Sequence, residues 1–277
     1  MKNVIAIDMG ATNIRVGILN EQLEILEVIR ERTSHEGNDA LISQIIRLIH
    51  AVHYEKYHVS SITIGVPGRV RKDGFIDELP NIHVEKLDFV TPLEKEFHVP
   101  TYVINDAVAA GIAEAVAGSG KNDKSVFFVT ISSGVGGSFF VDKQYTISSS
   151  EIGHTLFSYQ NHYYEFEKIA SGYGLLTLAK QNGLALQEGY EVFLGYQKQD
   201  PLCTKVYQDW LMLMHQFFSF IQDTFAPDVI VLTGGVMKSA SIFFEDMKKM
   251  NAQSKLVPAY YDQDAGLVGA GCYGLQK

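Results

Sequence analysis

Two aspartates of this 277-residue chain stand where an apolar strand ends. Asp8 interrupts the run VIAIDMG, and Asp106 closes the run YVIND. A carboxylate at a strand end that faces a cleft can accept the proton of an attacking hydroxyl group or bind Mg²⁺. Asp106 also precedes an alanine-rich helical segment, so simple helix capping is the alternative interpretation of that residue.

Three turns rich in glycine and hydroxyl side chains follow apolar strands, in DMGATN (8–13), SSGVGG (132–137) and LTGG (232–235). Glycine lets backbone N–H groups converge on an anion. Asp8 lies against the first turn, which favours a phosphate group with Mg²⁺ beside it. The chain has no Walker A sequence and no GxGxxG turn opening a helix. Hairpin turns also use glycine for structural reasons, but three such turns together favour a nucleotide.

Glu151 and His154 lie three residues apart in SEIGH and would share one face of a helical turn. Carboxylate and imidazole side chains can form several hydrogen bonds at once. By itself, this spacing could equally mean a metal site or a solvated surface pair.

The elements that must position these groups alternate between strands and helices, and their plan occurs twice. Residues 4–19 predict a strand, a turn and a strand, and residues 125–144 repeat this order. Thr91 is the expected N-cap of a short helix, with Glu94 completing a capping box. The polar segment SGKNDK (119–124) is the predicted boundary between two α/β domains of related plan. Further helices are predicted at 41–52, at 107–118, at 203–225 and near the C-terminus.

Composition limits the partners. A net charge of −9 without a block of Lys or Arg disfavours nucleic acid and anionic membranes. The two cysteines, Cys203 and Cys272, are far apart in the sequence and exclude a disulfide framework. No apolar run is long enough for a secretory signal or a membrane span. We therefore expect a cytoplasmic protein with small-molecule partners.

The motifs AIDMGATN, GVPG, PNI, IND, ISSGVGG, EIGH, EKIASG and VLTGGV occur in this order between residues 4 and about 271. Together they resemble the ROK family of sugar kinases, within the actin, hexokinase and Hsp70 superfamily. The resemblance implies an α/β fold of two RNase H-like (actin-like ATPase) domains with a cleft between them. Residues 1–118 would form the N-terminal domain, with the helix at about 262–277 packed back on it, and residues 119–261 the larger C-terminal domain.

The resemblance also implies a reaction: ATP-dependent phosphorylation of a hexose or amino-sugar hydroxyl, with Asp106 as general base. Asp8 would bind Mg²⁺ through a water molecule. The nucleotide and its phosphates would be bound by Asp8, Gly10, Thr12, Ser132, Ser133, Gly134, Gly136, Gly137, Gly234 and Gly235. The sugar would be bound by Asn81, Asn105, Glu151, His154 and Glu167.

Many family members bind a structural zinc through the counterpart of His154 and three cysteines. The matching positions here are Ser158, Gln160 and Glu165, so we expect no structural zinc. Aromatic packing is expected to order this loop instead, through Tyr159, Tyr163, Tyr164 and Phe166.

A second function stays open. Ser132 and Ser133 stand where the family usually has Gly-Thr, which favours a catalytically weak sugar- or nucleotide-binding regulatory protein of the same fold. The intact Asp8 and Asp106 favour the kinase. Repressors of the family add a DNA-binding helix-turn-helix, whereas this sequence begins at the first strand, so we expect a kinase that binds sugar and ATP, forms a homodimer and contacts no nucleic acid. The sugar and the phosphorylated hydroxyl are not predicted.

Overall fold

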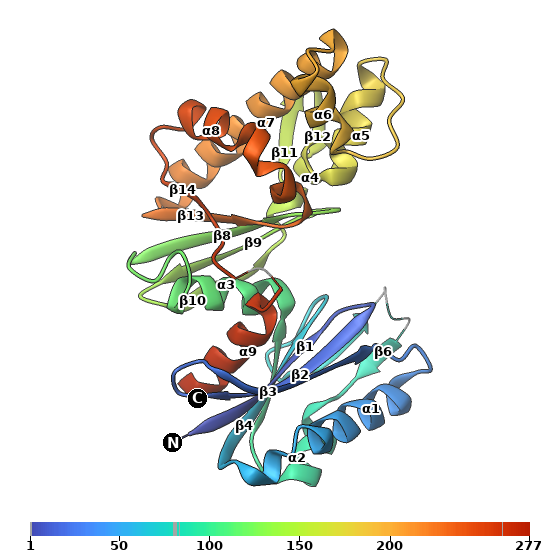
Figure 1. Cartoon of the computed structure of the whole chain (residues 1–277), viewed down its shortest axis with the longest axis vertical. Coiled ribbons are helices and arrows are strands. Elements are labelled where there is room, and N and C mark those ends of the chain that lie inside the picture. The colour runs from blue at the N-terminus through green and yellow to red at the C-terminus, as the bar shows by residue number, and fades with distance from the viewer. Residues whose placement is uncertain (1, 80–81, 83, 262) are drawn as a thin grey trace. The chain divides into compact units, whose positions relative to one another are not determined.

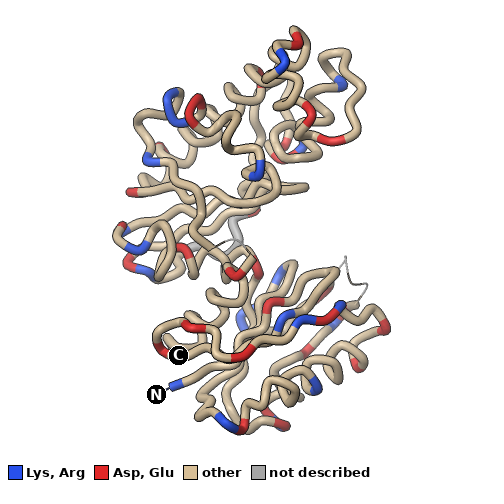
Figure 2. The backbone as a smooth tube through the Cα atoms, in the orientation of Figure 1, with Lys and Arg blue, Asp and Glu red and all other residues tan. Residues whose placement is uncertain are grey.

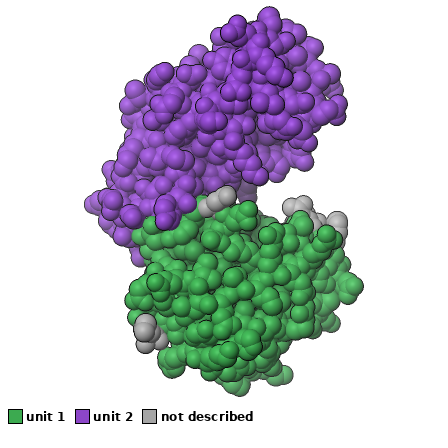
Figure 3. Space-filling view, in the orientation of Figure 1, with its two compact units in different colours: residues 1–117, 261–277 green, residues 118–260 purple. Residues whose placement is uncertain are grey.

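The computed structural model describes residues 2–79, 82, 84–261 and 263–277. It divides into two compact units (Figure 3). Unit 1 comprises residues 1–117 and 261–277, and unit 2 comprises residues 118–260. Both limits of unit 2 fall one residue before the predicted domain limits. That these units are the two predicted domains stays a prediction.

Unit 1 is built on a five-stranded sheet in the order β3-β2-β1-β4-β7. The first three strands are antiparallel neighbours, and β4 and β7 continue the sheet parallel to β1. The strands are β1 (Asn3–Met9), β2 (Asn13–Asn20), β3 (Ile25–Arg32), β4 (Val59–Val66) and β7 (Thr101–Asn105). The predicted hairpin is confirmed, and its turn is Gly10–Thr12.

Helices cover both faces of this sheet (Figure 1). On one face α1 (Asn38–Ala51) and α2 (Val90–Phe97) bury an apolar stripe against the strands. On the other face α9 (Ala265–Gln276) packs on α3 (Asp106–Val116), β1 and β4. A short ribbon of β5 (Ile76–Leu79) and β6 (Val84–Leu87) completes the unit, with the 3₁₀ turn Tyr54–Lys56.

Unit 2 repeats the plan with the sheet order β10-β9-β8-β13-β14. Again three antiparallel neighbours are extended by two parallel strands. The strands are β8 (Ser125–Ile131), β9 (Val135–Val141), β10 (Gln144–Ser150), β13 (Val229–Thr233) and β14 (Leu256–Pro258). The shared strand order confirms the prediction of an α/β fold built twice.

The core of unit 2 is rich in aromatic residues. The 25-residue helix α7 (Pro201–Phe225) supplies Trp210 and Phe217, and the Phe217 ring stacks on Phe166 with centroids 4.1 Å apart. Around α7 lie the hairpin β11 (Leu156–Tyr159) and β12 (His162–Glu165) and the helices α4 (Phe166–Ala170), α5 (Gly172–Gln181), α6 (Glu191–Gln197) and α8 (Ala240–Met250). Short 3₁₀ segments, η2 (Ile152–His154) and η3 (Gly235–Ser239), carry two of the predicted motifs.

The predicted N-cap of α2 is wrong. The helix begins at Val90 with Phe89 as N-cap, and the Thr91 N–H donates to the Asp88 carboxylate at 3.1 Å. Glu94 does not close a capping box, because its carboxylate accepts the N–H of Thr101 at the start of β7. The helix therefore starts earlier, and a neighbouring acid replaces the predicted cap.

Charge is distributed along both units. Lys and Arg are interspersed with Asp and Glu along the chain, and the basic residues are not concentrated in one segment (Figure 2). In the part of the chain that the structure describes, every helix is too short or too polar to span a bilayer.

Candidate active site

Asp106 is placed by the junction of β7 and α3. Asn105 is the N-cap of α3, because its Oδ1 accepts the Val108 N–H at 3.1 Å. The Asp106 carboxylate accepts the adjacent Ala107 N–H at 2.8 Å. Burial, opposed by that hydrogen bond and aided by the charge of Asp8, raises the pKa of Asp106 to about 6. The capping alternative therefore belongs to Asn105, and Asp106 has the pKa of a general base that works near neutrality.

The Asn105 side chain is largely used by the fold. Besides capping α3, its Nδ2 donates to the Gly68 carbonyl at 3.0 Å. One of the two Nδ2 protons of Asn105 therefore remains for the predicted contact with the sugar. This arrangement does not indicate that Asn105 dominates sugar binding. Asn81, the other predicted amide contact, lies outside the described residues.

Asp8 lies near the end of β1, directly opposite Arg15 of β2. Burial raises the pKa of Asp8, the Arg15 guanidinium lowers it, and Asp264 raises it again. Arg15 is held in turn by an ion pair with Asp264 and a hydrogen bond to the Gln263 carbonyl. Gly266 gives the Asp8 carboxylate its room, since a Cβ there would lie 2.5 Å from Oδ1.

These surroundings fit a divalent cation. Asp8 and Asp106 are both desolvated, and the charge of Asp8 raises the pKa of Asp106. A hard cation prefers oxygen ligands, and it would offset both the burial of the carboxylates and their repulsion. Asp8 is the residue that would hold Mg²⁺, directly or through water.

The first turn is held by its carbonyl groups. The Thr33 hydroxyl donates to the Gly10 carbonyl at 2.7 Å, the Thr33 N–H to the Thr12 carbonyl at 3.1 Å, and His35 lies 2.9 Å from the Ala11 carbonyl. Among the described residues, the N–H groups of Ala11 and Thr12 have no partner. A hollow of about 430 Å³ adjoins them. It is lined by Asp8, Gly10, Ala11, Thr12, Asn13, Arg15, Arg30 and Gln263, so donors and two arginines face the space where an anion would bind.

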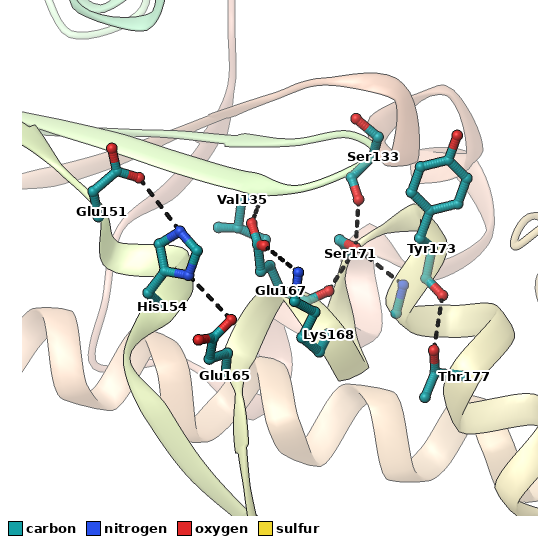
Figure 4. A network of polar contacts seen from close by, with 11 residues as sticks. Ser133, Val135, Glu151, His154, Glu165, Glu167, Lys168, Ser171, Tyr173 and Thr177 are labelled. Atoms are coloured by element: carbon teal, nitrogen blue, oxygen red, sulfur yellow. Dashed lines mark hydrogen bonds and ion pairs between the residues drawn. The ribbon is translucent and has the colours of Figure 1, made fainter. Parts of the chain in front are cut away.

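In unit 2 the second turn is anchored to the start of α5. The Gly172 N–H donates to the Ser132 carbonyl at 2.7 Å. Ser171 Oγ lies 2.8 Å from the Ser133 carbonyl oxygen and accepts the Gly174 N–H as the N-cap of α5 (Figure 4). The turn is therefore fixed by a buried serine that was not predicted from the sequence.

The third turn meets the second. Gly234 has φ of +102°, and a Cβ there would overlap the Ile131 backbone, so only glycine fits. A Cβ on Gly235 would lie 3.3 Å from Ser132 Oγ. Between these turns lies a pocket of about 260 Å³, lined by Ser132, Ser133, Gly172, Tyr173, Leu175, Leu176, Glu188, Gly189, Tyr190, Phe193, Gly235, Val236 and Ser239. Backbone, hydroxyl groups and two tyrosines thus surround a space suited to a nucleoside.

The three glycines of the second turn have different surroundings, so glycine is required at each for a different reason or for none. Gly134 lets a carboxylate approach, because a Cβ there would lie 2.8 Å from Glu167 Oε2. Gly136 pairs with Thr130 within the sheet. Gly137 is buried, and a Cβ there would meet the Phe127 ring at 3.0 Å. Packing alone accounts for glycine at 137, so its predicted phosphate contact has no support from this geometry.

The three predicted sugar residues of unit 2 lie in one polar network (Figure 4). Glu167 Oε2 accepts the Val135 N–H at 3.4 Å, and Glu167 Oε1 pairs with Lys168 at 3.1 Å. His154 Nε2 lies 3.7 Å from Glu151 Oε2, and its Nδ1 lies 3.1 Å from Glu165 Oε2. The hydrogen bond to Glu165 raises the pKa of His154, and the carboxylates of Glu167 and Glu151 add to the effect.

The segment expected to lack zinc is ordered as a hairpin. Gln160 and Asn161 both have positive φ (49° and 63°), as a type I′ turn requires. Phe166 is buried, Tyr159 and Tyr164 pack against the core, but Tyr163 is 76% exposed, so the predicted role of Tyr163 is wrong.

Ligand atoms of His154, Glu165 and Glu167 lie within 4.8 Å of one another, the only such group of three among the described residues. A hydrogen bond joins His154 to Glu165, whereas the Glu167 carboxylate is paired with Lys168 and the Val135 N–H. The absence of zinc stays a prediction, which elemental analysis of the purified protein would check.

Sequence reasoning missed several residues of these surroundings. Arg15 and Arg30 lie directly opposite each other on β2 and β3, beside Asp8. Their place was visible in the hairpin register, because residues in register share one face of a sheet. Ser171 lies in the EKIASG motif, but no role was predicted for it or for Tyr173 and Tyr190, since their roles depend on packing between segments distant in sequence.

Comparison with known proteins supports one family. The chain is 28% identical over 253 residues to an uncharacterized protein of Clostridium perfringens, with 86% of this chain and 82% of that protein covered. It is 24% identical to the glucokinase of Halalkalibacterium halodurans (96% and 93% covered) and 24% identical to the xylose repressor of Bacillus subtilis (96% and 75% covered).

Solved structures agree in fold. The ROK hexokinase of Thermus thermophilus superposes with a TM-score of 0.84 at 23% identity, covering 98% of this chain and 97% of that one. A ROK glucokinase of Streptomyces griseus, solved with glucose and AMPPNP, has a TM-score of 0.74 at 21% identity over 99% and 100% of the chains. The sequence model described as "ROK family" matches residues 4–275, and this chain therefore belongs to the ROK family, with its actin-like ATPase fold.

Proposed function

We propose that this protein transfers the γ-phosphoryl group of ATP to a hydroxyl group of a hexose or amino sugar. The observation that carries the proposal is Asp106, a carboxylate released from helix capping by Asn105, with a pKa raised to about 6. The glucokinase relative, and the related glucokinase solved with glucose and AMPPNP, support the same class of reaction.

The proposed roles follow from the charge of the reaction. Phosphoryl transfer passes through a loose transition state, so the protein positions the reactants and offsets phosphate charge. The Ala11 and Thr12 N–H groups with Arg15 and Arg30 would bind phosphate oxygens in unit 1. The pocket beside Ser132 and Gly235 would take the nucleoside in unit 2.

Asp106 would accept the proton of the sugar hydroxyl as its oxygen attacks phosphorus. The hydrogen bond that the Ala107 N–H donates to Oδ1 helps to fix this carboxylate. Mg²⁺ held by Asp8 would neutralise charge on the phosphate groups. Glu151, His154 and Glu167 would bind the other hydroxyls and so orient the attacking one.

The test is mass spectrometry of products after the purified protein is incubated with ATP, Mg²⁺ and a panel of hexoses and amino sugars. One phosphorylated sugar, absent without ATP, would support the proposal and identify the substrate. ATP or sugar binding without any product would contradict it.

That second outcome would favour the alternative, a regulatory protein that binds sugar or nucleotide without efficient catalysis. The specific observation behind this alternative is the Ser132–Ser133 pair of the second turn, together with the xylose repressor among the relatives. Cytoplasmic location, a homodimer and the absence of nucleic-acid binding are part of the proposal. Sedimentation velocity tests the homodimer.

A further inference from the structure

His154 is enclosed by carboxylates that differ in what they can do. Its Nε2 faces Glu151 at 3.7 Å, and its Nδ1 faces Glu165 at 3.1 Å (Figure 4). Glu151 is 75% exposed at its side chain, whereas Glu165 belongs to the hairpin β11–β12 and pairs through its backbone with Leu156. One side of the imidazole is therefore held by a fixed element, and the other faces the more exposed carboxylate.

Glu165 is available for this contact because, among the described residues, its carboxylate forms a hydrogen bond only with His154. It is the N-cap residue of α4, yet its side chain makes no capping hydrogen bond. The register of the hairpin, Leu156 opposite Glu165, brings the carboxylate beside His154, two residues before β11 begins. Tyr159 and Phe166 hold the two ends of the hairpin to the core.

A carboxylate on one imidazole nitrogen fixes the proton there and orients the ring. With the Nδ1 proton toward Glu165, Nε2 points toward the exposed Glu151 carboxylate, 3.7 Å away, and toward the side from which a ligand could reach it. We propose that Glu165 is a positioning residue that holds the His154 ring with Nδ1–H toward its own carboxylate and Nε2 toward a bound sugar oxygen. This inference rests on the proposed sugar-kinase function and deepens it.

Charge adds to the orientation. The titratable groups that face His154 are Glu151, Glu165 and Glu167, and Lys168 is paired with Glu167. Their carboxylates favour the imidazolium form, in which Nε2 donates to a sugar oxygen. Sugar binding should therefore weaken as pH rises through the raised pKa of His154.

Two substitutions separate charge from hydrogen bonding. Glu165→Gln keeps an oxygen that can accept from Nδ1–H but removes the charge, and Glu165→Leu removes both. His162→Gln is the matched control, because His162 is exposed on the same hairpin and its ring contacts Gln160 rather than His154.

The first measurement is a nitrogen-15 NMR titration of the imidazoles, with His154→Gln to assign the signal. We expect the His154 pKa to fall by about half a unit to one unit in Glu165→Gln. In Glu165→Leu the neutral ring should also move from the Nδ1–H to the Nε2–H tautomer. An unchanged pKa and tautomer in both variants would overturn the proposal, as would a stoichiometric metal bound through His154.

The second measurement is steady-state kinetics with the sugar that the mass-spectrometry panel identifies as the substrate. The KM for sugar should rise about fivefold in Glu165→Gln and more in Glu165→Leu, with kcat changed by less than about twofold. His162→Gln should leave both constants unchanged. A loss of kcat at constant KM would overturn the positioning role.

The two inferences fail separately. A wild-type protein that phosphorylates no sugar refutes the proposed kinase. The NMR titration needs no activity, and it then decides whether Glu165 orients His154.

Discussion

At the scale of the residue, Asp106 joins two properties that usually conflict. It lies at the N-terminus of α3, where an acid is normally stabilised in its charged form, yet burial and Asp8 raise its pKa to about 6. A carboxylate held in this way is a stronger base than a solvated one, at a cost in folding free energy. Its effects on catalysis and on stability can therefore be measured separately.

For catalysis, Asp106→Asn should lower kcat by about 10²–10⁴-fold with little change in the KM for sugar. The amide keeps the oxygen that accepts the Ala107 N–H but cannot take the substrate proton. Asp200→Asn is the matched control, because Asp200 caps α7 by accepting the Cys203 N–H, far from the predicted residues in sequence. An unchanged kcat in Asp106→Asn would show that Asp106 is not the general base.

The pH dependence has a defined direction. Asp106 accepts a proton only when ionised, so log(kcat/KM) should fall with a slope of about one as pH drops below about 6. Initial rates across this range, at saturating Mg²⁺, check the prediction. A profile that stays flat well below that pH would mean that another group accepts the proton.

For stability, the raised pKa means that the folded state binds the proton more tightly than the unfolded state. Between the unfolded value of 3.8 and about 6, folding stability should therefore fall as pH rises, and the loss is complete at neutral pH. Asp106→Asn removes this penalty and should stabilise the protein on the order of 2 kcal/mol near neutrality. Urea unfolding at several pH values measures it. The stability that Asp106→Asn gains over the wild-type protein must decrease as pH falls below about 6.

At the scale of the element, α5 fixes the second turn through its first residues. Ser171 is fully buried, caps α5 and contacts the Ser133 carbonyl. Ser171→Ala should therefore cost about 1–2 kcal/mol of stability and weaken ATP binding. Thr177→Ala on the same helix is the control, because Thr177 makes only one long contact, 3.4 Å, to Tyr173. Calorimetry of unfolding and of ATP binding measures both effects. Equal losses in the two variants would contradict the anchoring role.

The elements also show what sequence can and cannot predict here. Alternating and continuous apolar runs predicted both hairpins and the long helix α7, because those patterns depend on local periodicity. Caps were less predictable: Thr91 was expected to cap α2, but Asp88 reaches its N–H from outside the expected motif. For α3 the capping residue is Asn105 rather than Asp106, a choice that depends on side-chain rotamers.

The site was predictable where a motif carried it and hidden where packing created it. Asp8, Asp106 and the glycine turns could be named from their positions at strand ends. Glu165 was noted only as a missing zinc ligand, and its contact with His154 depends on the register of β11 and β12. Arg30 reaches the first turn only through pairing with Arg15 across β2 and β3.

At the scale of the whole molecule, the chain enters unit 2 at residue 118 and returns to unit 1 at residue 261. Unit 2 is thus continuous in sequence, whereas unit 1 needs its last 17 residues, Tyr261–Lys277. Those residues include α9, where a Cβ on Gly269 would overlap the Ala109 carbonyl of α3 and where the Gly274 carbonyl accepts the Ser61 hydroxyl. The close contact makes α9 part of the core of unit 1 rather than an appendage.

Because unit 1 includes the C-terminal helix and unit 2 does not, the two units should respond differently to C-terminal truncation. A chain ending at residue 260 should lose the cooperative unfolding of unit 1, because removal of α9 exposes the apolar face formed by α3, β1 and β4. Residues 118–260 expressed alone should unfold cooperatively, since their core contains α7 and its aromatic partners entire. Hydrogen exchange with mass spectrometry separates the units, because β4 and α3 should lose protection while β8 and β13 keep it.

Gly183→Ala is the opposite control: a side chain at its φ of +82° is strained although the surrounding space is open, and this strain lies in unit 2, so β4 should keep its protection. Protection retained in β4 after truncation would show that unit 1 folds without α9. In that case the C-terminal segment would be needed to position and tune the Asp8 carboxylate, through Asp264 and Gly266, rather than to stabilise the fold.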